Sequence, residues 1–176
     1  GGVDSGGTGG APSTFASGTI TGFGSIVVTA IHFDDRSASV HDGDGNARSR
    51  DDLRLGMTVE ASGGALFVDA DGNDASTATS IVFTSAIVGP VEANDTAART
   101  LTVLGQAVDV ASTTVFDDAL PGGQAALSVG DVVEVYGNLD VATGRYAATR
   151  IERKSVAASY RLRGVVVNLD AATRTF

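Results

Sequence analysis

A nine-residue segment occurs twice in this chain and identifies it as a repeat of one β module. Residues 55–63 read LGMTVEASG, and residues 129–137 read VGDVVEVYG. Two further segments recur: Gly18-Thr19-Ile20 at residues 89–91 and 164–166, and residues 78–81 at 148–151. All these anchors lie 70 to 75 residues apart, whereas a chance match would not hold one spacing. The chain is therefore built from modules of about 70 residues.

The repeat also predicts the domain organisation. Residues 168–176 match residues 93–101, so a third copy begins near the end and we expect the chain to be a fragment of a longer protein. The expected segments are a Gly-rich flexible tether over residues 1–16, module 1 over 17–85, module 2 over 86–157, and the start of an incomplete third module over 158–176.

Composition agrees with small β domains that pack against neighbours. The chain has no Cys or Trp and contains 23 Gly, so cores must be made mainly of Val, Ile, Leu, Ala and Phe. Modules of this size bury only about 60% of their unfolded surface and are marginal alone. The absence of Cys excludes disulfides and thiolate metal sites, and no apolar run approaches the roughly 20 residues of a membrane span.

Hydrophobic alternation in the second copy predicts five strands. Val108 and Val110 share one face by period-two alternation, as do Val133 and Val135. The predicted strands are residues 86–92, residues 100–104, residues 106–110 with a continuation over 113–116, residues 131–136 and residues 146–153. A loop over 117–123 and a helical turn over 124–127 fall between the third and fourth strands, which is the order of an OB-like barrel. The fold class predicted is therefore all-β, with tandem OB-like five-stranded barrels.

The first copy repeats the plan less clearly. Its predicted strands are residues 19–23, 25–29, 30–33, 57–62 and 80–84, with a further short strand over 65–69. We expect a turn of helix over residues 51–55.

The net charge of the chain argues against nucleic acid as a partner. The net charge is −9, whereas nucleic-acid binding depends on clustered Lys and Arg. The densest basic group surrounds the start of the third copy, and we interpret it as a solvated strand edge and linker, with an anion or partner contact as the alternative. Its members are Arg150, Arg153, Lys154, Arg161 and Arg163.

The strand and turn residues resemble those of a known family. The segments are GTITGFGSIVV at 18–28, VLGQ at 103–106 and ATRIE at 148–152. They are similar to a bacterial family of secreted, often lipid-anchored proteins whose domain is catalogued as of unknown function, and the similarity covers about residues 17–157. The resemblance implies a non-catalytic β domain and supplies no catalytic residues. Thr29-Ala30 departs from it, because a turn such as Asn-Gly is expected there.

The N-terminus and this resemblance together predict an extracytoplasmic location. Six of the first ten residues are Gly, as in the tether that follows the lipid-bearing Cys of a bacterial lipoprotein, although that Cys is not in this sequence. A plain disordered terminus or linker is the alternative. We expect a periplasmic protein, an outer-membrane lipoprotein or a cell-surface protein, with membrane contact only through a lipid anchor upstream of Gly1.

Two acidic turns are the only candidate metal sites. Both read D-x-D-x-N, the opening of a calcium loop. Neither has Gly at the sixth position or Glu at the twelfth, which is Leu53 or Ser80. Asp-Gly also favours hairpin turns, so the two interpretations are weak calcium sites and ordinary hairpins. The candidate ligands are Asp42, Asp44 and Asn46 in the first turn, and Asp69, Asp71 and Asn73 in the second.

An enzyme is not indicated. His32 and His41 are the only imidazoles, and we interpret both as solvated strand or turn residues. Glu60 and Glu134 hold equivalent positions in the repeat and are interpreted as outward strand residues. No sequence motif places a Ser or Thr nucleophile beside a general base that would activate it. No catalytic residue and no cofactor is therefore predicted.

The sequence therefore predicts a non-catalytic structural or interaction protein with protein partners. Self-association by strand addition through the termini would make it a filament-type subunit, and packing of the terminal strands on their own chain or on a third module is the alternative. A surface lipoprotein is the other role expected. The alternative is an OB-like module that binds a glycan or another small ligand.

Overall fold

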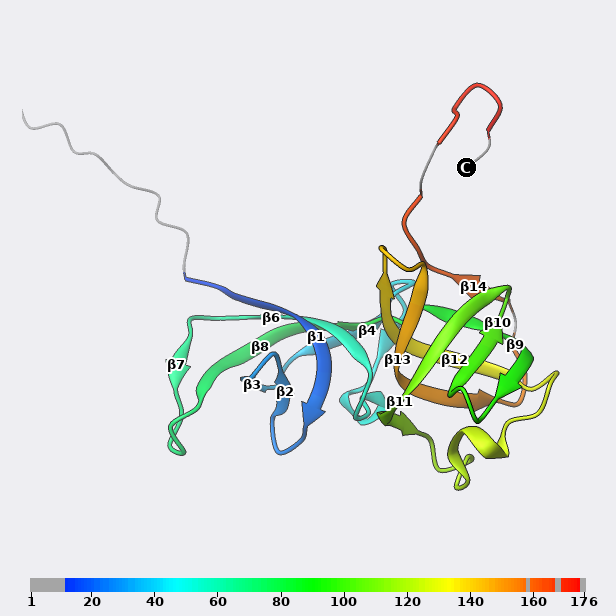
Figure 1. Ribbon diagram of the computed structural model, residues 1–176. Coiled ribbons are helices and arrows are strands. Elements are labelled where there is room, and N and C mark those ends of the chain that lie inside the picture. Colours follow the sequence, from blue (N-terminus) through cyan, green and yellow to red (C-terminus); the bar gives the residue numbers. More distant parts are fainter. Residues whose placement is uncertain (1–11, 158, 167–168, 175–176) are drawn as a thin grey trace, which may run out of the picture. The chain divides into compact units, whose positions relative to one another are not determined.

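The computed structural model describes residues 12–157, 159–166 and 169–174, and they form two compact units. The first unit contains the chain up to Asp52 together with Val59–Val82, and the second contains Leu53–Thr58 and the chain from Phe83 onward. Each unit carries one closed five-stranded β-barrel (Figure 1). The predicted fold class is thus confirmed.

The first unit contains eight strands and a single turn of 3₁₀ helix among its described residues. They are β1 (Thr14–Gly22), β2 (Ile26–Val28), β3 (Ile31–Asp34), β4 (Ser39–Asp42), β5 (Ala47–Arg48), η1 (Arg50–Asp52), β6 (Thr58–Gly63), β7 (Phe67–Val68) and β8 (Asp74–Phe83). The barrel runs β1-β2-β3-β8-β6 and back to β1, with β4, β5 and β7 added outside this ring. The β3–β8 pairing is parallel and closes the ring.

The second barrel repeats this order. Its elements are β9 (Ile87–Asp95), β10 (Thr100–Val103), β11 (Gln106–Phe116), η2 (Gly123–Ala126), β12 (Val132–Asp140) and β13 (Arg145–Lys154). The barrel runs β9-β10-β11-β13-β12 and back to β9, and again the third and fifth strands pair in parallel. A meander of three strands closed by a parallel contact between strands three and five is the OB topology.

Alternating apolar residues fill the barrel interiors, as the period of two requires. Val108, Val133 and Val135 are fully buried in the second core, and Val110 is nearly so. Phe33 and Ile81 occupy the first core. Each such side chain contributes about 1.5–3 kcal/mol of burial free energy, so these positions dominate the stability of each barrel.

Several predicted elements of the first copy differ from the structure. Strand β8 begins at Asp74, six residues before the predicted start, because its first half contains small and polar residues, such as Ala75 and Ala78, that carry a weak hydrophobic signal. The short strand predicted over 65–69 is β7, and the helical turn predicted over 51–55 is η1. Strands β4 and β5 were not predicted, although the turn between them is the first D-x-D-x-N segment, for which a hairpin was one of the two interpretations.

The chain ends lie partly outside the described residues, which exclude 1–11 of the expected tether. Residues 14–16 of that segment already belong to β1. Within the expected third copy, β14 (Arg161–Leu162) pairs antiparallel with β9, and Arg163 N donates to Ala86 O at 2.8 Å. This part of the third copy therefore packs on its own chain.

Candidate functional site

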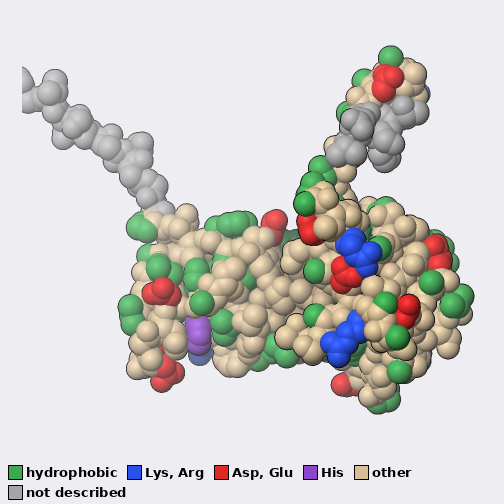
Figure 2. Space-filling model, viewed as in Figure 1, with side chains coloured by type: hydrophobic (Ala, Val, Ile, Leu, Met, Phe, Trp, Pro, Cys, Tyr) green, Lys and Arg blue, Asp and Glu red, His purple; other side chains and the backbone are tan. Residues whose placement is uncertain are grey.

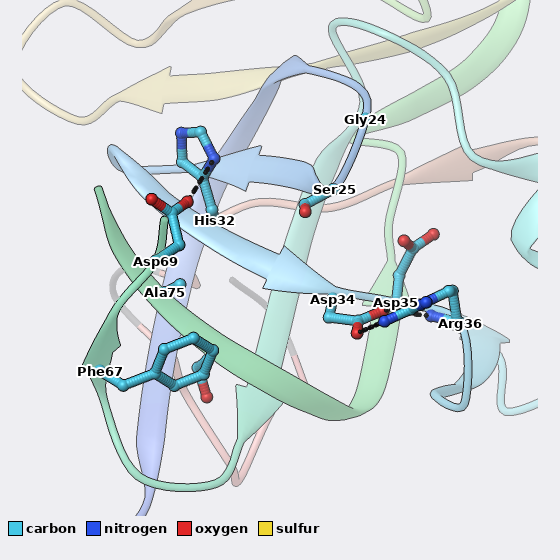
Figure 3. Close-up of a pocket in the computed structure, with 10 residues that line it drawn as sticks. Gly24, Ser25, His32, Asp34, Asp35, Arg36, Phe67, Asp69 and Ala75 are labelled. Carbon is cyan, nitrogen blue, oxygen red and sulfur yellow. Dashed lines mark hydrogen bonds and ion pairs between the residues drawn. The ribbon is translucent and has the colours of Figure 1, made fainter. Parts of the chain in front are cut away.

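A groove of about 290 Å³ opens on the first barrel. Three parts of the barrel line it: the β1–β2 turn, strand β3 with the two residues after it, and the hairpin between β7 and β8 (Figure 3). The lining residues are Gly24 and Ser25, then His32, Asp34, Asp35 and Arg36, and finally Phe67, Asp69, Ala75 and Ser76. These are the strand-three face and the loops L12 and L45 with which OB barrels bind ligands.

A row of three residues crosses the groove. Ala75 on β8 lies opposite His32 on β3 and opposite Phe67 on β7. Directly opposed residues of neighbouring strands project to the same face, and this face lies outside the barrel because the next residue, Phe33, is buried in the core. The small side chain of Ala75 leaves the space between the imidazole and the phenyl ring open (Figure 3).

An imidazole and a carboxylate face each other at one side of the groove. His32 Nδ1 lies 3.7 Å from Asp69 Oδ2. Asp69 also accepts hydrogen bonds at its Oδ1 from the backbone N–H groups of Asp71 and Asn73, both at 2.9 Å. The bond from Asn73 is the main cause that lowers the pKa of Asp69, and His32 adds to it. Asp69 is thus an ionised acceptor in a fixed orientation.

Two more carboxylates are held in place at the other side. Asp34 accepts from Arg36 Nε at 2.8 Å and Nη2 at 2.5 Å, and this pairing lowers the pKa of Asp34 to about 2. The neighbouring Asp35 is buried and pairs with Arg50 at 3.1 Å. Asp34 is therefore an ionised acceptor, and Arg36 is a donor at the rim.

Exposed aromatic side chains gather on the first unit. Phe67 in the groove is 49% exposed, and Phe15 and Phe23 are more exposed still, with Phe23 directly before the groove residue Gly24. In the described part of the second unit, no Phe is among the exposed large hydrophobic residues. Among the described residues, the exposed phenylalanines therefore belong to the first unit, whereas the exposed aromatic residue of the second unit is Tyr160, which lies between β13 and β14.

Both D-x-D-x-N segments form hairpin turns. Asp42 Oδ1 accepts from the backbone N–H groups of Asp44 and Asn46 at 3.0 Å, and Arg48 binds its Oδ2 at 2.7 Å. Asp69 is bound by its own turn in the same way. Among the described residues, no group of three or more His, Cys, Asp or Glu could hold a metal ion. The calcium hypothesis stays a prediction, and the hairpin geometry is observed.

Other residues singled out from the sequence are more dispersed. His41 lies half-buried on β4, Glu60 is exposed on β6, and Glu134 on β12 pairs with Lys154 at 2.6 Å. The groove residues Phe67 and Ala75 were not predicted, since no motif marks them. The available signal was the length of the segment between β6 and β8, which is longer than its counterpart between β12 and β13.

The interpretation of Arg150 as a solvated residue was wrong. Its side chain is only 8% exposed and donates to Glu152 Oε1 at 2.6 Å and to Leu55 O at 3.1 Å. Arg153 pairs with Asp131 at 2.9 Å. On the face shown in Figure 2, Lys and Arg side chains are few and have acidic side chains near them. The basic residues therefore do not form an anion-binding patch on this face.

Within the described part of the chain, no helix has the length and apolar character that a membrane crossing requires.

The comparisons with known proteins give one result. Residues 88–152, which include most of the second barrel, match the family model described as Domain of unknown function (DUF5666). The predicted resemblance to a family with a domain of unknown function is thus confirmed over these residues. Neither curated proteins nor solved structures give a match to the chain.

Proposed function

We propose that this chain is a non-catalytic, extracytoplasmic interaction protein whose first barrel binds a neutral carbohydrate in the groove. The observation that carries the proposal is the row of His32, Ala75 and Phe67 on the outer face of strand three, between L12 and L45. This is the surface on which OB barrels bind oligonucleotides and oligosaccharides.

The charges of the groove favour a sugar over a nucleotide. Asp34, Asp35 and Asp69 present carboxylate oxygens, which only accept hydrogen bonds when ionised. Sugar hydroxyls donate to such oxygens, whereas phosphate would be repelled by them and by the net charge of −9. Arg36 and His32 supply donors for hydroxyl oxygens, and Phe67 offers an apolar face to the C–H groups of a sugar ring.

The pKa shifts support binding rather than hydrolysis. Glycosidases need a carboxylic acid whose pKa is raised so that it can protonate the leaving group. The pKa of Asp34 is lowered by Arg36, and that of Asp69 by the backbone of its own turn. Both groups are therefore ionised at neutral pH and cannot serve as the acid.

The extracytoplasmic location rests on the sequence. The Gly-rich start and the resemblance to secreted, often lipid-anchored proteins both support it. A glycan-binding barrel in that location would meet cell-wall or capsular polysaccharides.

Calorimetric titration of the full chain with soluble oligosaccharides tests the binding function. The probes are hexasaccharides of β-glucan, chitin and cellulose, with a phosphorylated hexose as the charged comparison. We expect at least one neutral hexasaccharide to bind, and Phe67→Ala to weaken it about fivefold to tenfold, the value of one aromatic contact. Val68→Ala is the control, because Val68 is exposed on the same strand outside the groove.

A groove-filling variant gives an independent test. Ala75→Arg would place a long side chain between His32 and Phe67 and should abolish binding while the barrel stays folded. If no neutral hexasaccharide binds at millimolar concentration, or if Ala75→Arg and Phe67→Ala bind like the unmodified chain, the proposed function is wrong.

A further inference from the structure

The repeated nine-residue segment begins with the same turn in both copies. Gly56 and Gly130 have positive φ values of 85° and 93°. The residue after each glycine donates its N–H to the carbonyl three residues before it, Met57 to Arg54 at 3.2 Å and Asp131 to Ser128 at 3.1 Å. Positive φ explains the glycine in both turns, so any difference in role must come from their surroundings.

The first of these turns is covered. Leu53–Thr58 belongs to the second unit, where Thr149 Oγ1 donates to Gly56 O at 2.6 Å and Arg150 Nη1 donates to Leu55 O at 3.1 Å. A Cβ atom on Gly56 would lie 2.6 Å from Thr149 O and 3.0 Å from Arg150 Cβ. The turn of the first repeat is therefore in close contact with the outer side of β13.

The second turn is open. A Cβ atom on Gly130 would meet nothing within 4 Å, and Val129, which holds the place of Leu55, is 68% exposed. The carbonyls of Val129 and Gly130 correspond to the two that accept from β13 in the first turn. A turn of the same shape thus displays an apolar side chain and two acceptors to solvent.

We infer that the turn at Val129-Gly130 docks on the outer side of β8 in the first barrel of a second copy. Strand β8 is the counterpart of β13, and residues 78–81 match residues 148–151. Thr79 holds the place of Thr149 and is exposed. The contact joins different surfaces of the two copies, so it propagates into an open, filament-like chain.

The chemistry of this contact predicts a weak association. Thr79 Oγ1 donates to Ser62 O at 3.1 Å, so it would exchange this bond for one to Gly130 O, with little net gain. Ser80 replaces Arg150 and cannot repeat the long-range guanidinium bond. Burial of Val129 is the main gain, and assembly should depend on concentration.

Sedimentation velocity of the full chain across a concentration series tests this inference. We expect the average mass to rise with concentration, and Val129→Asp to remain monomeric. Val141→Asp is the matched control, because Val141 is 66% exposed in a different turn of the same barrel, and this variant should assemble like the unmodified chain. Melting temperatures of all variants verify that each is folded.

Mixing two variants tests the head-to-tail geometry. Thr79→Asp should also remain monomeric, yet a mixture with Val129→Asp contains one intact pair of surfaces and should form a dimer that cannot grow. A chain that stays monomeric at every concentration, a Val129→Asp variant that assembles normally, or a mixture without dimer would each overturn the inference. Neither the concentration series nor the mixing experiment depends on the groove, because Thr79 and Val129 do not line it.

Discussion

The two barrels share a strand order and differ at the positions that surround the groove. In the first barrel, Ala75 and Ser76 follow the first residue of β8, where the second has Arg145 and Tyr146 at the start of β13. The segment between the fourth and fifth barrel strands is long in the first barrel and carries β7, whereas in the second it is the short turn after Asp140. Small residues and a long loop therefore make a groove from a common scaffold.

Both barrels have an aspartate at the same position of the third strand, but a different arginine binds it in each. Asp34 follows the core residue Phe33, and Asp109 follows its counterpart Val108. Asp109 is bound across the sheet by Arg145, with Nε at 2.9 Å, whereas Asp34 is bound by Arg36 from the turn that follows β3. Arg145 thus fills in the second barrel the space that Ala75 leaves open in the first. The groove therefore arises from this change of side chain together with the longer loop that carries β7, on a shared strand order.

The largest expected effect tests whether the barrels are independent. Phe33 and Val108 hold equivalent, fully buried positions. Phe33→Ala should destabilise the first barrel by about 3–5 kcal/mol and Val108→Ala the second by about 2 kcal/mol, since more volume is removed from the first core. Hydrogen exchange measured by mass spectrometry should show faster exchange only in the barrel that carries the change. Loss of protection in both barrels with either variant would contradict two separate units.

A smaller effect should distinguish two equivalent glutamates. Glu134 has its side chain 14% exposed and bound to Lys154, while Glu60 is exposed. Glu134→Gln should cost about 2 kcal/mol, because Lys154 loses a partly buried partner. Glu60→Gln should change stability by less than about 0.5 kcal/mol. Chemical denaturation of both variants checks this prediction. Equally small changes in the free energy of unfolding would show that the ion pairs among Glu134, Glu152, Lys154 and Arg150 add no stability.

Low pH should weaken the ion pairs that Glu152 forms with Arg150 and Lys154. Burial opposes ionisation of Glu152, but hydrogen bonds from Arg150 and Lys154 outweigh it and lower its pKa below the ordinary 4.5. A lowered folded pKa stabilises the protein above the unfolded value, and this contribution is lost as pH falls through the folded value. Thermal melts of the second barrel should therefore fall in temperature below about pH 4.5. The fall should be shallower in Glu152→Gln, and a parallel fall would assign the acid sensitivity to other carboxylates.

Opposite substitutions in the hairpin between the second and third barrel strands should change stability in opposite directions, Ala30→Gly in the first barrel and Gly105→Ala in the second. Thr29 and Ala30 have φ values of 49° and 65°, and Leu104 and Gly105 have 49° and 70°. Both are turns with two positive φ values, which favour Gly at the second position. Ala30→Gly should stabilise the first barrel by about 0.5 kcal/mol, and Gly105→Ala should destabilise the second by about 1 kcal/mol. Denaturation midpoints that move in the same direction would contradict this.

The sequence predicted what local periodicity determines. Strand order, the η2 turn and the buried faces at Val108 and Val133 follow from alternation and from the repeat. The Thr29-Ala30 turn departs from Asn-Gly in residue type, yet its backbone has the two positive φ values that Asn-Gly would supply. Regular elements were predictable because their signal lies within a few residues.

The groove and the buried charges were not predictable from spacing. His32 meets Asp69 and Ala75 only because the parallel β3–β8 contact brings together strands about 40 residues apart. Arg150 reads as solvated in a basic stretch, but its partner Leu55 lies 95 residues earlier in the chain. Contacts at such separations depend on barrel closure, which a residue pattern does not encode locally.

The smallest expected effect concerns calcium. Asp42 and Asp69 each accept two backbone N–H bonds within their own turns, and Asp42 also binds Arg48. Burial opposes ionisation of Asp42, but Asn46 and Arg48 outweigh it and lower its pKa. Neither turn has a carboxylate at the twelfth position to close a calcium loop.

Melts of the full chain in millimolar calcium and in chelator should therefore coincide within about 1 °C, since an ion that does not bind adds no stability. A larger rise would contradict this expectation, and two variants would then locate the ion. Loss of the rise in Asp42→Asn would place the ion beside Arg48, where a cation must displace a guanidinium. Loss in Asp69→Asn would place it in the groove, beside His32. An ion beside His32 would mean that the groove of the first barrel binds a cation as well as a sugar. The second barrel has no such site in its described residues, so the two barrels would then differ further in what they bind.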